Sequence, residues 1–283
     1  MSRKNWASEK IFSRLLNNRT QKTYWDNINE LRSRPNQEVF NKAMQLAKSK
    51  SDKEKNIGIA ILAQLGFDPR FNQIETIKLY FELLTQDQSI DVLISILYAI
   101  SHNFEILTEK QVNILQTFKN NESSYVRTAL ANAISCLQDD QSIDTLILLS
   151  KDTSSSVRNW ATFSLGTLIE INNKKITDAL WKRVDDKHQE TKLEAILGLA
   201  IRKDNRVKEI VRRELKYGEY GTLLFEAIEQ LNDKDFLPLL EDNLQSSYHD
   251  DGILDEWILD LKDCISKLKN SDNETHQKVS FNN

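Results

Sequence analysis

The sequence predicts an all-α fold, a right-handed α-solenoid of about six to seven helix pairs. The first observation is a ten-residue phrase, residues 157–166, which recurs in degraded form at intervals of 31 to 35 residues. Self-similarity at that period is typical of stacked helix pairs, each too small to bury its apolar face alone. The second observation is composition, because 7 glycines and 3 prolines among 283 residues suit a nearly all-helical chain.

A short polar turn before the second helix of each pair sets the register of the repeats. The turn anchors are spaced 35, 34, 31, 34, 32 and 32 residues apart. They are Asp52, Asp87, Asn121, Asp152, Asp186, Gly218 and, more loosely, Asp250. Asp52, Asp87 and Asp152 are expected to cap the helices that follow, because a carboxylate accepts a backbone N–H at a helix start.

Apolar residues recur five, nine and thirteen positions after the anchors. Steps of four residues place them on one stripe of each second helix, which is predicted to form the core. The predicted core residues are Ile57, Ile61, Leu65, Val92, Ile96, Ile100, Val126, Leu130, Ile134, Val157, Ala161, Leu165, Thr191, Ala195, Leu199, Leu223, Ala227 and Leu231. Small residues such as Gly66 and Gly166 follow, and they permit close helix approach or a helix end.

The remaining elements follow from this register in chain order. Residues 1–35 are expected to form an N-terminal helical cap, followed by a repeat array over residues 36–268. Amphipathic runs between the anchors supply the first helix of each pair. They span residues 74–84, 112–118, 143–149, 176–184 and 207–215. A seventh unit carries Asp255 and Asp263 at apolar positions, as a terminal repeat with a polar outer face does, and the polar residues 269–283 are expected to be a disordered tail.

The phrase at residues 157–166, Val-Arg-Asn-Trp-Ala-Thr-Phe-Ser-Leu-Gly, resembles HEAT repeats of the short type found in phycobilisome lyases. The resemblance covers roughly residues 36–268. It extends to small bacterial HEAT-repeat proteins of no assigned activity through further phrases at residues 61–66, 159–163, 194–200 and 225–227. A scaffold does not determine what it carries, so the resemblance implies the fold and leaves the function open.

In that family a Val-Arg pair opens the second helix, and the arginine reaches turn aspartates to form a ladder along the stack. The resemblance implies a full match at Asp152 and Arg158. Weaker copies are implied at Asn121 with Arg127 and at Asp186 with Lys192. The first two repeats have Gly58 and Leu93 where the cation would stand, so the ladder is expected only in the middle of the array.

A second stripe, at positions 4, 8, 11 and 15 after each anchor, is turned away from the predicted core. By resemblance to HEAT stacks it lines the concave surface. None of its 24 positions is lysine or arginine, although these make up 38 of the 283 residues. The candidate partner-binding residues of this stripe are Tyr98, His102, Tyr125, Asn132, Trp160, Phe163, Glu190, Glu194, Glu226 and Glu229. Aromatic anchors beside carboxylates favour a protein or a cationic peptide as partner.

Structural roles for the same residues stay open. Trp160 can fill the wedge between neighbouring repeats, and Phe163 can belong to the core. Glu194 and Glu226 can reflect helix propensity or a salt bridge to an adjacent repeat. A register shifted by one residue would also rotate the whole face by about 100°.

Several functional classes are disfavoured. Nucleic acid binding needs a row of cations, which the stripe and the net charge of −4 do not supply. The HEAT-repeat deoxyhypusine hydroxylase carries His-Glu pairs as iron ligands, and none of the four histidines here is followed by glutamate. No pair of a catalytic nucleophile and a general base can be recognised in the sequence. We therefore predict no catalytic residue, no metal and no cofactor.

The predicted function is a non-catalytic scaffold that binds a partner protein or peptide in its concave groove. The alternative is a lyase-like enzyme or a chaperone of a planar ligand such as a tetrapyrrole, because phycobilin lyases share this repeat type. No stretch approaches the roughly 18 apolar residues of a membrane helix, and no signal peptide is recognisable. With two widely separated cysteines, Cys136 and Cys264, we expect a cytoplasmic monomer without membrane contact.

Overall fold

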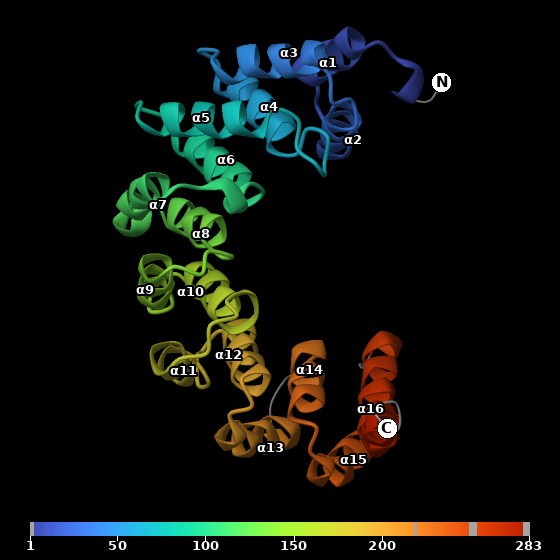
Figure 1. Cartoon of the computed structure of the whole chain (residues 1–283). Coiled ribbons are helices and arrows are strands. Elements are labelled where there is room, and N and C mark those ends of the chain that lie inside the picture. Colours follow the sequence, from blue (N-terminus) through green and yellow to red (C-terminus); the bar gives the residue numbers. More distant parts are fainter. Residues whose placement is uncertain (1–2, 218–219, 249–253, 280–283) are drawn as a thin grey trace. The chain divides into compact units, whose positions relative to one another are not determined.

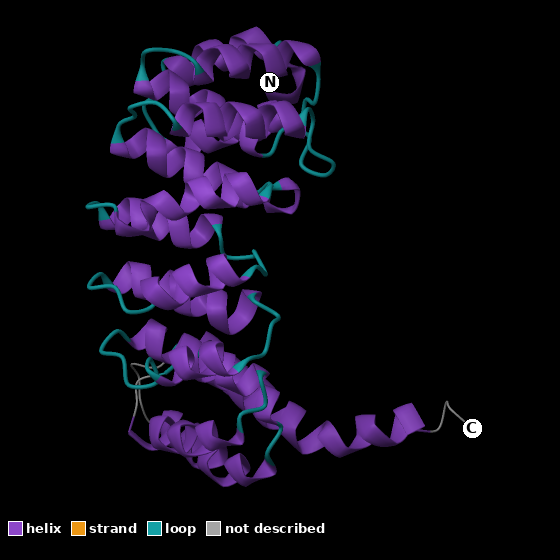
Figure 2. Ribbon diagram, turned by 60° about the vertical axis from the view of Figure 1, so that its left-hand side comes forward, coloured by secondary structure: helices purple, strands orange, loops and turns teal. Residues whose placement is uncertain are grey.

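The computed structural model describes residues 3–217, 220–248 and 254–279. Within these ranges the chain forms helices and loops and no strand, as Figure 2 shows. The all-α solenoid class predicted from the repeats is confirmed. Contacts group the chain into two compact units, residues 1–137 (unit 1) and 138–283 (unit 2). The anchors Gly218 and Asp250 lie outside the described residues.

Unit 1 is built from helix pairs in two layers. Its helices are α1 (Ser8–Leu16), α2 (Gln21–Arg32), α3 (Gln37–Ala47), α4 (Asp52–Ala63), α5 (Gln73–Leu84), α6 (Ile90–Ser101), α7 (Glu109–Leu115) and α8 (Ser124–Ala133). The second helices α4, α6 and α8 contact one another in sequence, and α2 extends the same layer by packing on α4. The first helices α3, α5 and α7 form the other layer (Figure 1).

Unit 2 repeats this arrangement. Its helices are α9 (Asp140–Leu149), α10 (Ser155–Phe163), α11 (Lys174–Trp181), α12 (Gln189–Ile201), α13 (Lys208–Tyr217), α14 (Thr222–Leu231), α15 (Leu237–Ser247) and α16 (Asp255–Val279). The second helices α10, α12, α14 and α16 pack in a row. Within this unit they lie on the inner side of the curve, and α9, α11, α13 and α15 lie on its outer side (Figure 1).

The core follows the predicted stripe. All of its predicted residues are buried except Leu223 and Leu231, which are half-buried. The terminal pair also behaves as predicted, because Asp263 of α16 remains 62% exposed while Leu261 and Leu268 on its other face are buried. The sequence predicts a disordered tail over residues 269–283. In the structure, residues 269–279 continue α16, and residues 280–283 lie outside the described part of the chain.

Close backbone approach explains two small residues. A Cβ atom added at Gly198 of α12 would lie 2.5 Å from Cα of Gly166, which follows α10 in a π-helical turn (Ser164–Leu168). A Cβ atom at Gly58 of α4 would lie 2.4 Å from the carbonyl oxygen of Ala43 in α3. The backbone of α3 thus occupies the space where the first repeat would otherwise carry a ladder cation.

The predicted capping residues need correction. Ser89 caps α6 by accepting from the Val92 N–H, so Asp87 does not. Asp52 is already the first residue of α4. The Asp152 carboxylate accepts from the Ser154 N–H at 2.8 Å, in the turn before α10. Serines close to each helix start take the positions that the anchor alignment assigned to aspartates, because either side chain fits the end of a helix.

None of the described helices combines the length and apolar character needed to cross a membrane. Both cysteines are free thiols. Cytoplasmic location and monomeric state stay predictions.

Candidate functional site

Part of the predicted site gathers on the inner layer of unit 2. We define the second-helix face of unit 2 by Trp160 and Phe163 of α10, Glu190 and Glu194 of α12, and Glu226 and Glu229 of α14. The rings of Trp160 and Phe163 meet edge to face with centroids 5.8 Å apart. Both residues are half-buried.

Contacts between α10 and α12 fix the register across this face. Asn159 donates through Nδ2 to Oε2 of Glu190 at 3.4 Å, and the Thr191 hydroxyl donates to Oδ1 of Asn159 at 3.3 Å. Residue 159 is therefore level with residues 190 and 191. Trp160, the next residue of α10, consequently lies between the levels of Glu190 and Glu194 on successive turns of α12.

Glu194 is the most unusual residue of the face. Its side chain is only 9% exposed, and its Oε2 atom is buried without a hydrogen-bond partner. Burial raises the pKa of Glu194 to about 7, with further contributions from the negative charges of Glu226 and Glu190. Removing a carboxylate from water disfavours its charged form, and neighbouring carboxylates act in the same direction.

The two glutamates of α14 differ in their surroundings. Glu226 is exposed. Glu229 accepts hydrogen bonds from Lys267 of α16 at 3.1 and 3.2 Å, and Lys267 also pairs with Asp263 of its own helix at 2.7 Å. Glu229, predicted to bind a partner, is therefore already held in an ion pair within the chain. The stripe itself contains no cation, but Lys267 of α16, whose repeat contributes no residue to the stripe, forms an ion pair with Glu229.

The predicted residues of unit 1 lie on α6, on α8 and directly after α6. Tyr125 is 74% exposed, Tyr98 and His102 are exposed at the end of α6, and Asn132 is half-buried. Gln64 contacts Nδ1 of His102 at 3.2 Å. Burial and the charges of Arg32 and Arg70 lower the pKa of His102.

Two cations on this side of unit 1 were not predicted. Arg32 donates to Oε1 of Gln64 at 2.7 Å, and Arg70 donates to the His102 carbonyl at 3.0 Å. Arg32 closes α2 and Arg70 follows α4, so neither falls on a stripe position of the repeat alignment. The repeat alignment therefore could not identify these two arginines.

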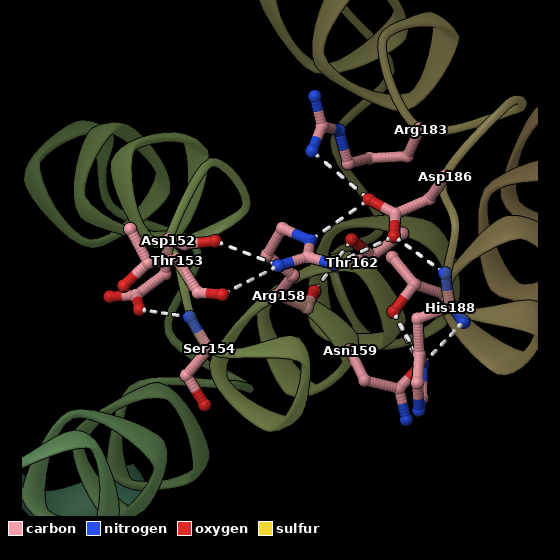
Figure 3. Close-up of polar contacts among 10 residues, drawn as sticks. Asp152, Thr153, Ser154, Arg158, Asn159, Thr162, Arg183, Asp186 and His188 are labelled. Atoms are coloured by element: carbon pink, nitrogen blue, oxygen red, sulfur yellow. Dashed lines mark hydrogen bonds and ion pairs between the residues drawn. The ribbon is translucent and has the colours of Figure 1, made fainter.

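The ladder predicted from the resemblance connects neighbouring repeats in unit 2 (Figure 3). Arg158 donates through Nε and Nη2 to the two carboxylate oxygens of Asp186, at 2.9 and 2.8 Å. Its Nη1 donates to the carbonyl oxygens of Asp152 and Thr153. Burial alone would raise the pKa of Asp186, but hydrogen bonds from Arg158 and from the His188 N–H hold it below its usual value.

The pairing within each repeat differs from the expectation. Arg158 contacts the backbone carbonyl of Asp152, and Arg127 likewise donates to the carbonyl of Asn121 at 2.7 Å. Lys192 does not repeat the pattern with Asp186, because it donates to Glu214 of α13 at 2.5 Å. The ammonium group of lysine is a single point of charge and binds one nearby carboxylate. The planar guanidinium group of arginine donates from several nitrogens and can bridge two turns.

The described residues hold no cluster of three or more side chains suited to a metal ion. The pockets among the described residues include one of about 280 Å³ in unit 2 and one of about 660 Å³ in unit 1. The first is lined by Lys151, Asp152, Arg158, Lys182, Arg183, Asp185, Asp186 and Lys187. The second is lined by Arg3, Lys4, Trp6, Asp26, Asn29, Glu30, Ser33 and Phe67. Neither includes Trp160, Tyr98 or His102.

Comparison with known proteins gives one informative relative. No family model matches the chain. Protein YibA from Escherichia coli (strain K12) is 31% identical over 240 residues, which cover 82% of this chain and 83% of YibA. The X-ray structure of Escherichia coli YibA superposes with a TM-score of 0.69 at 28% identity, over 94% of this chain and 93% of that one. An engineered protein of known crystal structure has a TM-score of 0.51 at 15% identity, over 92% and 78% of the two chains, and is alike in fold alone.

Proposed function

The chain belongs to the same family as Protein YibA, and from that premise we propose that it is a non-catalytic helical-repeat scaffold. Its partner is a protein or peptide with a cationic segment, bound on the second-helix face of unit 2. The observation that carries it is Glu194, a buried carboxylate with an unpartnered oxygen, flanked by Glu226 and Glu190.

Electrostatics and shape favour a protein partner for this face. Like charges on adjacent helices repel, and a cationic partner removes that repulsion when it binds. Trp160 and Phe163 offer rigid apolar area beside the charges, which is the composition of binding hot spots.

We further assign the repeats to the HEAT type. Support comes from Arg158, which opens α10 after Val157 and bridges two consecutive turns. An arginine that joins neighbouring repeats is what the resemblance of residues 157–166 implies, and the bridge from Arg158 to Asp186 is one such contact.

A selection from a random displayed library of 12-residue peptides on the immobilised protein tests the proposed function. We expect recovered peptides to be enriched in lysine and arginine. Their affinity, measured by fluorescence anisotropy, should fall at least tenfold in the double variant Trp160→Ala/Glu226→Lys, since hot-spot truncation costs about 1.4 kcal/mol or more. The control is Tyr217→Ala/Glu170→Lys, which likewise removes an aromatic ring and reverses a glutamate charge, at exposed positions outside this face. Equal affinity of a folded Trp160→Ala/Glu226→Lys variant would refute the proposal.

A further inference from the structure

Glu194 stands apart from the other buried carboxylates of unit 2. The side chain of Asp186 is 4% exposed and is paired with Arg158 and Arg183. That of Glu214 is 5% exposed and is paired with Lys192 and Arg213. An unpaired buried carboxylate is costly, and proteins normally provide a partner for it. Among the described residues of this unit, no side chain does so for Oε2 of Glu194.

The helices around Glu194 bring further negative charge and no available cation. Its helix α12 packs against α10, α11, α14 and the turns that follow α10 and α12. The carboxylates that face Glu194 are Glu190 of α12 and Glu226 of α14. The cations of α10, of α12 and of the turns that follow α12 form contacts with other groups. Arg158 binds Asp186, Lys192 binds Glu214, Arg202 donates to the carbonyls of Leu165 and Gly166, and Arg206 binds Asp204.

One oxygen of Glu194 remains open to a donor from outside. Oε2 is enclosed and unpartnered, whereas Oε1 is not among the enclosed atoms without a partner, and 9% of the residue stays exposed. Trp160 lies at this level of the neighbouring helix, and an aromatic ring suits the alkyl stem or the charged head of a long basic side chain. A divalent metal would need several convergent ligands, which the described residues do not offer.

We infer that Glu194 accepts one lysine or arginine side chain of the bound segment, and that this contact expels a proton from the Glu194 carboxyl group. The inference rests on the proposed function and deepens it. In the step, the carboxyl O–H bond breaks and its proton passes to the solvent buffer. An N–H group of the ammonium or guanidinium then donates to the resulting carboxylate.

This step makes the affinity for a cationic segment rise with pH. With the pKa of Glu194 at about 7 in the free protein, the carboxyl group is about half protonated at neutral pH. A cationic ligand binds the charged form, so affinity should rise about tenfold from pH 6 to pH 8. A peptide without histidine keeps its own charge over this range.

The test is an NMR titration of the full-length protein carrying ¹³C at Cδ of its glutamates. The Glu194 resonance is identified by its loss in Glu194→Gln. The probe is Nα-acetyl-L-arginine amide, and the matched control is the uncharged Nα-acetyl-L-citrulline amide with sodium chloride at the same ionic strength. We expect the titration midpoint of Glu194 to fall by about one pH unit with an excess of the arginine probe and to stay unchanged with citrulline.

The outcomes separate this inference from the proposed function. An unchanged midpoint with the arginine probe overturns the inference, even if selected peptides still bind in a manner that depends on Trp160 and Glu226. A lowered midpoint supports the cation site at Glu194, even if the peptide selection fails and the scaffold proposal falls. Peptide affinities that remain equal at pH 6 and pH 8 would also overturn it, whereas a tenfold rise that disappears in Glu194→Gln would support it.

Discussion

At the scale of single residues, the buried carboxylates of Asp186 and Glu194 have opposite surroundings. Asp186 accepts a bidentate pair of hydrogen bonds from Arg158, whereas Oε2 of Glu194 accepts none. Proteins tolerate an unfavourable buried group where a site needs it, and such positions trade stability for function. The contrast between these two carboxylates is therefore an argument about binding as well as about folding.

Glu194→Gln is expected to stabilise the protein at alkaline pH. The folded-state pKa of about 7 lies above the usual glutamate value of about 4.3, so wild-type stability declines as pH rises through that interval. At pH 8 the substitution should raise the free energy of unfolding by about 2 kcal/mol, and at pH 4 it should change it little. Urea unfolding at both pH values measures this. Glu226→Gln, at an exposed position, is the control and should stay within about 0.5 kcal/mol. An unaltered pH profile in Glu194→Gln would contradict the assigned burial.

Arg158→Lys is expected to destabilise the protein despite keeping the charge. Lysine cannot reproduce the paired contacts with Asp186 or reach the carbonyls of the preceding turn as well. With Arg158 15% and Asp186 4% exposed, the loss should be about 2 kcal/mol in urea unfolding. Lys174→Ala removes an exposed pair with Asp178 and should cost less than about 0.5 kcal/mol. Equal effects of the two variants would show that the bridge is not structural.

At the scale of elements, the repeat register predicts burial well and polar partners poorly. A stripe repeated every four residues predicted the core of the second helices, because residue spacing sets which face of a helix turns toward its neighbours. Lys192 bonds Glu214 of a first helix, and Glu229 bonds Lys267 of α16. Long polar side chains pair with residues of other elements, and the repeat alignment, which compares equivalent positions, does not relate those elements to one another. Glu194 was predicted to belong to the site, but its burial depends on how α10 and α14 pack against α12.

Gly198→Ala tests the close approach of α12 to the turn after α10. The added methyl group would lie 2.5 Å from Cα of Gly166, so one backbone must move. We expect a loss of about 3 kcal/mol or more, seen as a lower midpoint in urea, because overpacking against backbone is poorly relieved. Gly221→Ala has no atom within 4 Å of the new methyl and should cost about 1 kcal/mol or less, the cost of a poorer helix cap. A Gly198→Ala protein as stable as wild type would contradict this packing.

At the scale of the whole molecule, the contacts that join neighbouring repeats stay within one unit. The bridge from Arg158 to Asp186, the contact of Gly166 with Gly198, and the packing of Trp257 on Tyr220 and Phe225 all lie within unit 2. In repeat proteins stability is close to a sum of repeat terms and nearest-neighbour terms. The repeat period predicted this organisation, but it held no signal for a division near residue 137, because the spacing of the anchors does not change there.

Residues 138–283 are therefore expected to fold as an isolated fragment. Circular dichroism should show a helical spectrum and a cooperative thermal transition, because each helix of this unit keeps its neighbours within the unit. The control fragment, residues 170–283, lacks α9 and α10. It leaves Asp186 without Arg158 and exposes the face of α12 that contains Gly198. That fragment should lose cooperativity and melt at lower temperature, since an end repeat with an uncovered apolar face is unstable. If both fragments melted alike, nearest-neighbour packing between α10 and α12 would not be what holds the unit together.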